Sequence, residues 1–356
     1  ISVNVQIPKF IEQVAKGEFK AAVDIIKETN LLPAICGRVC PQEKQCQGQC
    51  TVGKVYKNAE KSVSIGRLER FVADWERTNN LVTSPAIAPS TGKKVAVVGS
   101  GPAGLTVAGD LARQGFHVTI FEGQPEPGGV LMYGIPEYRL LKAVVRNEIK
   151  RIEALGVTFV TNCLVGDPQS GVTVDSLFAD GFDAIFMGTG TALPQNLNIP
   201  GANLRRVTQS TDFLHNVNAY MEGAMPYEMV PLRRGDRVAV IGGGNVAMDA
   251  ARTAKRLGAD VTVVYRRTQA EMPAIKSEYD DAVAEGVKFM WQTNSLEFIG
   301  NEKGHVCAIR LSTPQGECTE PFDRVFLAIG SRPAARIVST TTGIQVDEKG
   351  YVICGE

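Results

Sequence analysis

Histidine is scarce in this sequence. The chain of 356 residues contains only three, His117, His215 and His305. None of them belongs to a recognisable nucleophile or metal motif, so each is interpreted as structural. A hydrolase that depends on a histidine general base is therefore excluded, because no residues would carry its chemistry.

The chain also lacks long hydrophobic runs and an excess of charge of either sign. Its longest apolar stretches, such as VAVVG and VAVIGGG, have the length of a strand and are too short to span a membrane. Basic and acidic residues both number 38, so no net charge attracts the chain to nucleic acid or to an anionic membrane. No secretory signal is recognisable, which predicts a cytoplasmic protein with no nucleic-acid or membrane partner.

The pattern of the chain changes along its length. Apolar residues recur at helical spacing over residues 7–30, where Gly17 interrupts them, and again over residues 64–76. The proline- and serine-rich stretch SPAIAPSTGKK then predicts a linker. Beyond it, a strand, glycine turn, helix and strand follow one another at residues 93–123 and recur at residues 236–267. This repeat predicts two parallel α/β domains of the kind that binds dinucleotides.

The first glycine turn has the features of an FAD site. It follows the strand VAVV and opens an apolar helix, and its residues are Gly99, Gly101, Pro102, Ala103 and Gly104. Glycine allows a tight turn and close approach of the backbone to a pyrophosphate, which the helix N-terminus then binds. Glu122 ends the second strand, where an acid can bind a ribose diol. Gly128, Gly129 and Val130 follow soon after, and the whole pattern favours FAD over a purely structural turn.

The second glycine turn differs from the first in the residues placed to contact the ribose. The turn is formed by Gly242, Gly243, Gly244, Asn245 and Val246, and its second strand ends in Arg266 and Arg267. An arginine pairs with a 2′-phosphate, whereas an acid would repel it. The sequence therefore predicts NADP(H) here, although the two arginines could instead be a solvated strand end. Two different dinucleotides together predict a flavoprotein that passes a hydride from NADPH to FAD.

Four of the eight cysteines lie in one short loop, CGRVCPQEKQCQGQC, as Cys36, Cys40, Cys46 and Cys50. In the cytosol such a cluster binds metal more often than it forms disulfides. Structural zinc generally uses tighter CxxC pairs, so the Cys-Pro step and the spacing favour an iron–sulfur cluster, with zinc and disulfides as alternatives. The other cysteines, Cys163, Cys307, Cys318 and Cys354, are isolated, which leaves no dithiol to receive electrons from the flavin.

The chain resembles a known family at several of these motifs. CGRVCPQEKQCQGQC, SIGRLERFVADWE, VAVVGSGPAGL, PGGVLMYGIPEYRL, IGGGNVAMDAARTAKRLGA and VYRRTQAEMPA look like the small subunit of NADPH-dependent glutamate synthase. The same block occurs in the NADPH-binding large subunit of ferredoxin:NADP transhydrogenase and in the N-terminal half of dihydropyrimidine dehydrogenase. The match extends along essentially the whole chain and is specific to the family rather than to one member.

The resemblance implies FAD, NADP(H) and [4Fe-4S] clusters, together with further site residues. It implies that Cys40, Cys46 and Cys50 hold one cluster, that Cys36 is the weakest ligand candidate, and that Glu69 serves a second cluster. On composition alone, Glu69 could equally be an exposed acid on an amphipathic helix. The resemblance further implies that Arg139 contacts the flavin and that Ala328, Ile329 and Gly330 pass near the nicotinamide.

The expected architecture is an α/β protein with two Rossmann-like dinucleotide-binding domains preceded by a small helical iron–sulfur domain. The expected domains are residues 1–85 for iron–sulfur, 92–200 continued by 325–356 for FAD, and 201–324 for NADPH. The family's upstream cysteine motif and its closing Gly-Asp motif are missing from the sequence. The FAD domain is therefore expected to be incomplete and the chain to be a fragment.

The expected function is electron transfer from NADPH through FAD and the clusters to a second oxidoreductase subunit, which contacts the helical module. Glutamate synthase is the first interpretation, with its large subunit as partner. The alternatives are the NADPH-binding subunit of a flavin-bifurcating transhydrogenase, whose partner is its small subunit, a non-catalytic electron-carrier or scaffold subunit, and a zinc-stabilised NADPH oxidase. The sequence assigns no catalytic side chain, because the cofactors carry the chemistry.

Overall fold

The computed structural model describes residues 4–83, 85–167, 169–191, 193–333 and 336–353. Its chain forms two compact units. The first comprises residues up to 132, residues 137–190 and those from 334 onward, and the second comprises residues 133–136 and 191–333. None of the described helices is both long and apolar enough to cross a membrane.

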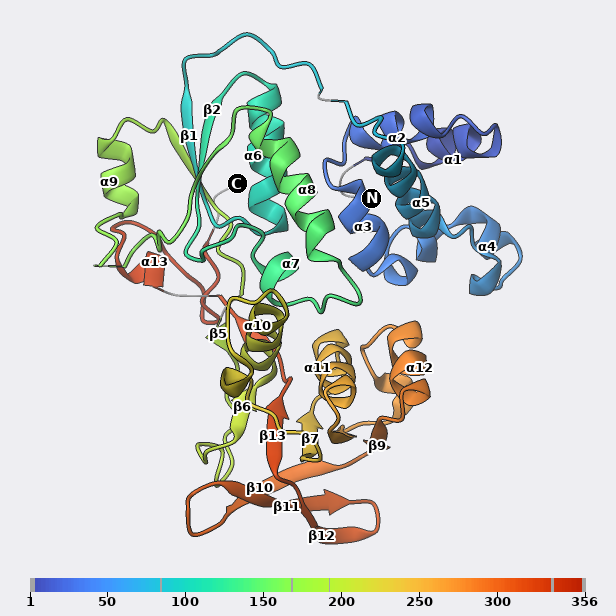
Figure 1. Ribbon diagram of the computed structural model, residues 1–356, viewed down its shortest axis with the longest axis vertical. Coiled ribbons are helices and arrows are strands. Elements are labelled where there is room, and N and C mark those ends of the chain that lie inside the picture. Colours follow the sequence, from blue (N-terminus) through green and yellow to red (C-terminus); the bar gives the residue numbers. More distant parts are fainter. Residues whose placement is uncertain (1–3, 84, 168, 192, 334–335, 354–356) are drawn as a thin grey trace. The chain divides into compact units, whose positions relative to one another are not determined.

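Short helices form the N-terminal part of the first unit, here called the helical module (residues 4–83) (Figure 1). Gly17 separates the first two helices in a left-handed conformation at φ +80°, as expected from the sequence. A Cβ on Gly37 would lie 2.5 Å from the backbone nitrogen of Arg70, so the helices around them pack backbone to backbone. The helices are α1 (Ile7–Ala15), α2 (Phe19–Lys27), α3 (Pro33–Val39), α4 (Thr51–Val55) and α5 (Ile65–Thr78), with short 3-10 turns η1 (Gln42–Lys44), η2 (Gln47–Gln49) and η3 (Ala59–Lys61).

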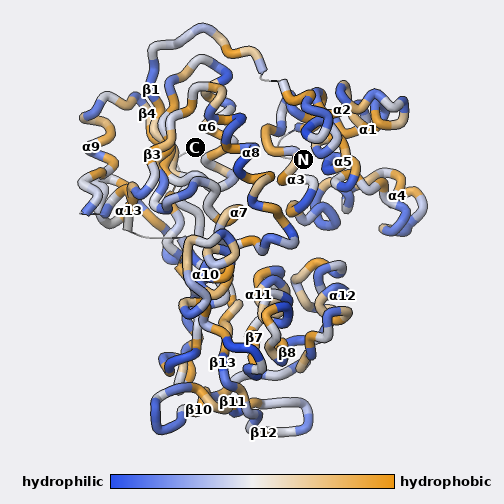
Figure 2. The backbone as a smooth tube through the Cα atoms, viewed as in Figure 1, coloured by the Kyte–Doolittle hydropathy of each residue, from blue (hydrophilic) through white to orange (hydrophobic). Residues whose placement is uncertain are grey.

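The module has a small core of its own. Apolar side chains from its helices meet there, and Figure 2 shows hydrophobic segments alternating with hydrophilic ones along these helices. This is the pattern of amphipathic helices that bury one face. The core residues are Phe10, Ala22, Val23, Ile26, Ile65 and Val72.

A four-stranded parallel sheet of order β3-β2-β1-β4 forms the rest of the first unit. Its central strands are almost fully buried because helices cover the sheet. Cys163 lies in this core, as expected for an isolated apolar cysteine. The elements are β1 (Lys94–Val98), α6 (Pro102–Arg113), β2 (His117–Phe121), α7 (Val130–Tyr133), α8 (Lys142–Glu153), β3 (Thr158–Val160), α9 (Val174–Ala179), β4 (Ala184–Met187) and α13 (Arg336–Ser339).

The second unit is built on a five-stranded parallel sheet of order β6-β13-β7-β8-β9. Its strands and main helices are β6 (Val207–Gln209), α10 (Ser210–Met221), β7 (Arg237–Ile241), α11 (Asn245–Arg256), β8 (Asp260–Val264), α12 (Lys276–Ala284), β9 (Lys288–Met290) and β13 (Arg324–Leu327), with 3-10 turns η4 (Tyr227–Met229) and η5 (Gln269–Glu271). An antiparallel sheet contains β10 (Asn294–Gly300), β11 (Val306–Thr313) and β12 (Gly316–Pro321), and β5 (Leu193–Pro194) pairs with β14 (Ser331–Arg332).

The fold class expected from the sequence is confirmed, with two parallel α/β sheets and a helical N-terminal module. The exact domain boundaries stay a prediction. In the structure, β13 pairs with β6 and β7 inside the second unit, and the units divide after residues 190 and 333.

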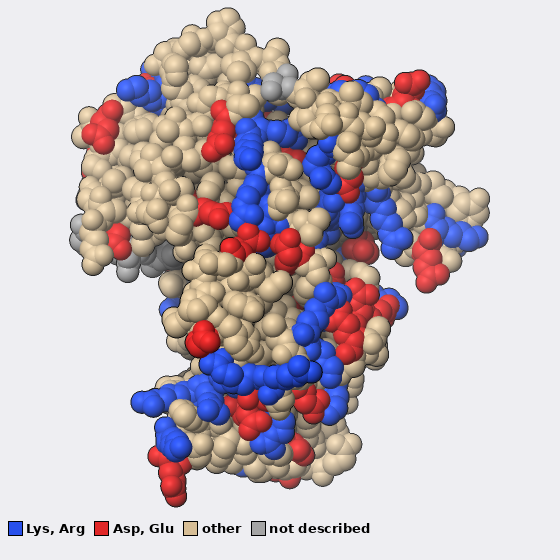
Figure 3. Space-filling view, viewed as in Figure 1, with Lys and Arg blue, Asp and Glu red and all other residues tan. Residues whose placement is uncertain are grey.

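An ion pair joins the starts of β7 and β13. Arg237 donates from its backbone N, Nε and Nη2 to the Asp323 carboxylate, each at 2.9 Å. Figure 3 shows further Lys and Arg side chains over this part of the second unit. The hydrogen bonds from Arg237 lower the pKa of Asp323 to about 2.

This lowered pKa predicts a loss of stability in acid. Because the folded-state pKa lies below the ordinary value of 3.8, the contribution of Asp323 is complete above about pH 4 and disappears as the pH falls toward 2. Asp323→Asn should lower the free energy of unfolding by about 1 kcal/mol at pH 7, after screening of this partly exposed pair, and by much less near pH 2.5. Denaturant unfolding at both pH values measures the difference, with Glu302→Gln as control, since Glu302 makes no ion pair among the described residues. Equal losses at both pH values would contradict the assignment.

Candidate functional site

The glycine turn after β1 combines tight backbone packing with one open position. A Cβ on Gly104 would lie 2.0 Å from the carbonyl oxygen of Gly99, and a Cβ on Gly99 would lie 2.6 Å from that of Gly188. Gly99 also has a φ of +94°, which favours glycine. A Cβ on Gly101, by contrast, would have no atom within 4 Å. The open side of Gly101 is therefore where a ligand can approach the backbone.

The α6 N-terminus next to this opening has the properties of an anion site. Gly101 is its N-cap and no side chain caps the helix, while Pro102 occupies the first turn and Ala103 is exposed. The uncapped N–H groups and the positive end of the helix dipole favour a phosphate group. This arrangement fits the FAD pyrophosphate expected at the turn.

The Glu122 carboxylate holds the same turn in place by accepting hydrogen bonds. Its carboxylate accepts hydrogen bonds from the Ser100 backbone N at 2.9 Å, from the Ser100 hydroxyl, and from the Gln124 backbone N at 2.8 Å. The Ser100 hydroxyl in turn accepts from the Gly128 backbone N at 2.8 Å. The buried acid therefore orders the loop, a role that sequence reasoning missed when it assigned Glu122 only to the ribose.

The second glycine pair lies directly against the first turn. A Cβ on Gly129 would lie 3.0 Å from the Gly101 Cα, and Gly129 has a φ of +52°. Val130 begins α7 and is 55% exposed. Arg139 lies half-buried in the loop between α7 and α8. The structure thus brings the two predicted glycine motifs together and leaves the contact of Arg139 with a flavin as a prediction.

The second unit contains a cavity of about 680 Å³ at the carboxyl ends of β7, β8 and β13. All ten residues that the sequence assigned to NADP(H) line it. They are Gly242, Gly243, Gly244, Asn245, Val246, Arg266, Arg267, Ala328, Ile329 and Gly330. Sequence reasoning missed the residues that complete the wall, because they lie in no local motif. These include Gln195, Gln209, Thr211, Pro273, Thr293, Asn294, Ser295 and Ser331.

The second glycine turn repeats the arrangement of the first. Gly242 has a φ of +139°, and its Cβ would lie 2.3 Å from the Ala328 carbonyl oxygen. A Cβ on Gly243 would lie 2.6 Å from the Tyr265 ring. At Gly244, the uncapped N-cap of α11, no atom lies within 4 Å of a Cβ. Close packing behind the turn and open space before it leave the α11 N-terminus accessible to a pyrophosphate.

The side chains around this turn make different contacts. Asn245 accepts a hydrogen bond from the Ile275 backbone N at 2.9 Å, so it fixes the segment before α12. Arg266 and Arg267 are exposed, and neither guanidinium makes an ion pair within the part of the chain that the structure describes. Glu271, which follows soon after them in the chain, instead accepts hydrogen bonds from the Thr268 hydroxyl and backbone N. Both arginines therefore remain available for a phosphate at the cavity edge.

The side chain of Asn30 links Glu69 on α5 to the first thiol of the cysteine loop. The Asn30 amide donates to Glu69 Oε1 at 2.7 Å, and the Cys36 thiol lies 3.6 Å from Asn30 Oδ1. Burial, and then the charge of Cys36, raise the pKa of Glu69 to about 8. The Cys36–Cys40 hydrogen bond raises the pKa of the Cys36 thiol and lowers that of Cys40.

Cys46 and Cys50 differ in their surroundings. Burial raises the pKa of the Cys46 thiol, and the nearby Glu69 charge adds to this effect. Backbone N–H groups of Gly53 and Val63 lower the pKa of the Cys50 thiol. The four thiols therefore have different surroundings, and the ligand roles of Cys40, Cys46, Cys50 and Glu69, with Cys36 as the weakest candidate, stay predictions.

The donor chemistry of this loop fits an iron–sulfur cluster. Thiols favour iron–sulfur clusters and zinc over harder cations, and the seven described cysteines form no disulfide. Among the described residues, no three histidine, cysteine, aspartate or glutamate side chains already converge on one metal position. The thiols and the carboxylate are the right donors, but they do not by themselves form a complete ligand set.

Comparison with known families matches both parts of the chain. The family described as pyridine nucleotide-disulphide oxidoreductase matches residues 93–356. The family described as dihydropyrimidine dehydrogenase domain II, 4Fe-4S cluster, matches residues 1–81. The first match covers both dinucleotide-binding sheets, and the second covers the helical module with its cysteine loop.

Several curated relatives are similar over nearly the whole chain. The glutamate synthase [NADPH] small chain of Halomonas elongata is 35% identical, over 97% of this chain and 75% of that protein. The small chain of Escherichia coli is 33% identical, over 98% of this chain and 77% of that protein. The NADP(+)-dependent formate dehydrogenase subunit beta of Moorella thermoacetica is 37% identical, over 98% of this chain but 52% of that protein. The chain thus spans between about half and three quarters of the length of the curated relatives it matches.

Solved structures share the fold. FprA from Mycobacterium tuberculosis in complex with NADPH has a TM-score of 0.57 at 22% identity, over 73% of this chain and 74% of that chain. Thioredoxin reductase of Lactococcus lactis has a TM-score of 0.53 at 23% identity, over 74% of this chain and 85% of that chain. At this level of identity the likeness establishes the fold alone.

Proposed function

The chain belongs to the pyridine nucleotide-disulphide oxidoreductase family and is a relative of glutamate synthase [NADPH] small chains, and from this premise we propose that it delivers electrons from NADPH to a second oxidoreductase subunit. Its domains are those of an NADPH-dependent FAD and iron–sulfur oxidoreductase. The acceptor that we propose is the large subunit of glutamate synthase, since relatives from three organisms carry that small-chain name.

The observation that carries the proposal is the cavity of the second unit. One wall is the glycine turn with the uncapped α11 N-terminus, and one edge carries Arg266 and Arg267. The α11 N–H groups bind the pyrophosphate of NADPH, while the two guanidinium groups bind its 2′-phosphate. The backbone at Ala328 to Gly330 borders the same cavity and leaves room for the nicotinamide end.

The first unit supplies the second binding site. The α6 N-terminus and the open face of Gly101 receive the FAD pyrophosphate, and Glu122 keeps the turn in its binding conformation through Ser100. FAD, when bound, supplies the exchange between a two-electron donor and one-electron acceptors. Cys40, Cys46 and Cys50 are the donors that would hold one iron–sulfur cluster, with Cys36 as the weakest candidate, and Glu69 is the residue that would serve a second cluster.

The proposal is tested by anaerobic titration of the full-length, cofactor-loaded protein with NADPH and, separately, with NADH. NADPH should bleach the flavin absorbance and then the broad iron–sulfur absorbance, and NADH should do so only at much higher concentration. A flavin that NADPH does not bleach would favour a non-catalytic carrier or scaffold. Bleaching without any broad band would contradict the cluster assignment, and metal analysis would then reveal zinc if the loop holds it.

The acceptor requires its own test. Relatives include a formate dehydrogenase subunit beta and an NADPH-Fe(3+) oxidoreductase subunit beta, so the same chain type occurs in proteins with other names. The NADPH-reduced protein should support conversion of 2-oxoglutarate and glutamine to glutamate when a glutamate synthase large subunit is added. Reduction of ferredoxin in an NADH-dependent reaction instead would identify the bifurcating transhydrogenase type.

A further inference from the structure

One short segment of the chain lies in a different unit from its neighbours. Tyr133–Pro136, here called the crossing segment, belongs to the second unit, whereas the residues before and after it belong to the first. Tyr133 also ends α7, the short helix that follows Gly128 and Gly129 beside the first glycine turn. The chain therefore passes from the unit of the FAD-binding turn to the unit of the NADPH cavity, and back, within a few residues.

In the first unit, Lys142 holds both flanks of the crossing segment. This residue begins α8 and is only 1% exposed. Its Nζ donates to the Leu131 carbonyl oxygen at 3.0 Å, and its backbone N donates to Glu137 Oε2 at 2.9 Å. Because Leu131 and Glu137 lie on either side of the segment, one residue of α8 fixes the chain both where it leaves the first unit and where it returns.

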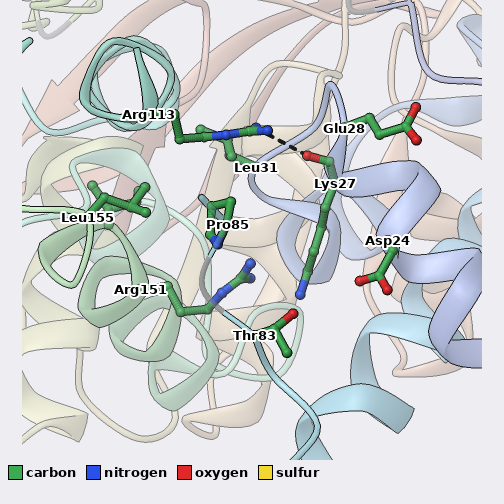
Figure 4. A pocket seen from close by; sticks show the side chains of 10 residues that line it. Asp24, Lys27, Glu28, Leu31, Thr83, Pro85, Arg113, Arg151 and Leu155 are labelled. Atoms are coloured by element: carbon green, nitrogen blue, oxygen red, sulfur yellow. Dashed lines mark hydrogen bonds between the residues drawn. The ribbon is translucent and has the colours of Figure 1, made fainter. Parts of the chain in front are cut away.

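Helix α8 is itself anchored in the first unit, where it packs against α3 and α6. Toward its C-terminal end, Arg151 and Ile152 border a cavity of about 170 Å³, which residues of the helical module line from the other side (Figure 4). At this cavity, Arg113 on α6 donates to the Lys27 carbonyl oxygen at 3.3 Å. The start of α8 is therefore a firm support for the two flanks.

In the second unit, α10 holds the crossing segment itself. The Asn218 side-chain amide donates to the Tyr133 carbonyl oxygen at 2.8 Å and to the Ile135 carbonyl oxygen at 3.2 Å. One turn earlier on α10, the His215 ring stacks on the Tyr133 ring, with centroids 4.8 Å apart and an angle of 12° between the planes. Asn218 is 4% exposed, so water does not readily replace its two hydrogen bonds.

Helix α10 also takes part in the NADPH cavity. Gln209, which precedes the helix, and Thr211 in its first turn both line the cavity. Farther along, the Phe213 ring stacks on Phe326 of β13 with centroids 4.2 Å apart, which fixes α10 to the five-stranded sheet. The same helix therefore borders the NADPH cavity near its start and holds the crossing segment near its end.

We propose that Asn218 is a positioning residue that links the FAD-binding loop to the NADPH-binding unit. The path through the chain is short, because a Cβ on Gly129 would lie 3.0 Å from the Gly101 Cα, α7 follows directly, and Asn218 holds the end of α7. The inference rests on the proposed function in one respect, namely that a hydride passes between nucleotides bound to the two units. Asn218 belongs to neither glycine turn and is not a lining residue of the NADPH cavity. Loss of its amide should therefore change the alignment of the two cofactors and not their binding.

The experiment compares Asn218→Leu with wild type in the full-length, cofactor-loaded protein, because leucine keeps the approximate volume and removes both donors. Rapid mixing with saturating NADPH should show flavin bleaching slowed about tenfold or more, as expected when a reacting pair is misaligned. Flavin content and the Kd for NADP+ should stay within about twofold of wild type, because Lys142 still holds the flanks. Asn216→Leu is the matched control, since this asparagine of α10 donates to the Met229 carbonyl oxygen at 3.2 Å. Loss of FAD or a raised Kd in Asn218→Leu would assign the residue to cofactor binding and overturn the positioning role.

A second readout needs no cofactor. Chymotrypsin cleaves after tyrosine, and cleavage after Tyr133 requires the crossing segment to leave α10. In the apoprotein this cleavage, followed by mass spectrometry, should be about tenfold faster in Asn218→Leu and unchanged in Asn216→Leu. Cleavage that is equally faster after Tyr220, on the same helix, would indicate general unfolding, and Asn218→Ala then repeats both measurements, since alanine favours helix and also lacks the donors.

The two readouts separate the failure of this inference from the failure of the proposed function. If NADPH fails to bleach the wild-type flavin, the proposed function fails, while proteolysis still tests whether Asn218 holds the crossing segment. Bleaching and cleavage at wild-type rates in Asn218→Leu would overturn the positioning role.

Discussion

Replacing Arg266 and Arg267 together by alanine should raise the KM for NADPH about 100-fold and leave the KM for NADH within about twofold. Both guanidinium groups border the cavity, are exposed and make no ion pair within the described ranges. A charge-assisted hydrogen bond to phosphate is worth about 1.5–3 kcal/mol, so two arginines account for an effect of this size. NADH lacks the 2′-phosphate, so its binding should not depend on either arginine.

Steady-state kinetics with an artificial electron acceptor measures both KM values. Arg205→Ala is the matched control, because this exposed arginine precedes β6, at the opposite end of the sheet from the cavity. Unchanged kinetics with NADPH would make the two arginines a solvated strand end, the alternative that the sequence left open. An equal rise in KM for both nucleotides would assign the arginines to a part of the ligand that NADPH and NADH share.

Gly101→Ala should abolish most FAD binding without destabilising the apoprotein. Gly101 has a φ of −65°, which any residue adopts, and a Cβ there meets no atom within 4 Å. Removal of glycine flexibility from the unfolded chain should leave the free energy of unfolding equal or raised by about 0.5 kcal/mol. If the pyrophosphate approaches the backbone at this opening, the added methyl group occupies its place, and flavin content should fall about tenfold or more.

Gly104→Ala is the contrasting variant at the same turn. Its Cβ would lie 2.0 Å from the Gly99 carbonyl oxygen, so it should destabilise the apoprotein itself. Denaturant unfolding of the apoprotein and flavin absorbance after reconstitution separate the two effects. If the Gly101→Ala protein retains its full FAD content, the pyrophosphate does not approach the backbone at Gly101, and the proposed position of the cofactor is wrong.

The sequence predicted a local motif wherever residues adjacent in the chain determine its backbone conformation. The two strand–glycine–helix units are encoded in this way, since a left-handed φ at Gly99 or Gly242 and an uncapped helix start depend on adjacent residues. The division of the first helical stretch at Gly17 is equally local. The antiparallel sheet of β10, β11 and β12 was not predicted, because no motif in those residues marks how they pair.

The sequence by itself determined the fold class, the two glycine turns, the arginine pair and the concentration of thiols in one loop, since each depends on contiguous residues. Only the tertiary structure decided that Glu122 accepts hydrogen bonds from Ser100, that Asn30 contacts both Glu69 and Cys36, and that Lys27 pairs with Glu76. These outcomes depend on pairs far apart in the chain. Their partners are chosen by how helices and sheets pack and by the cost of burying charge, which no local spacing encodes.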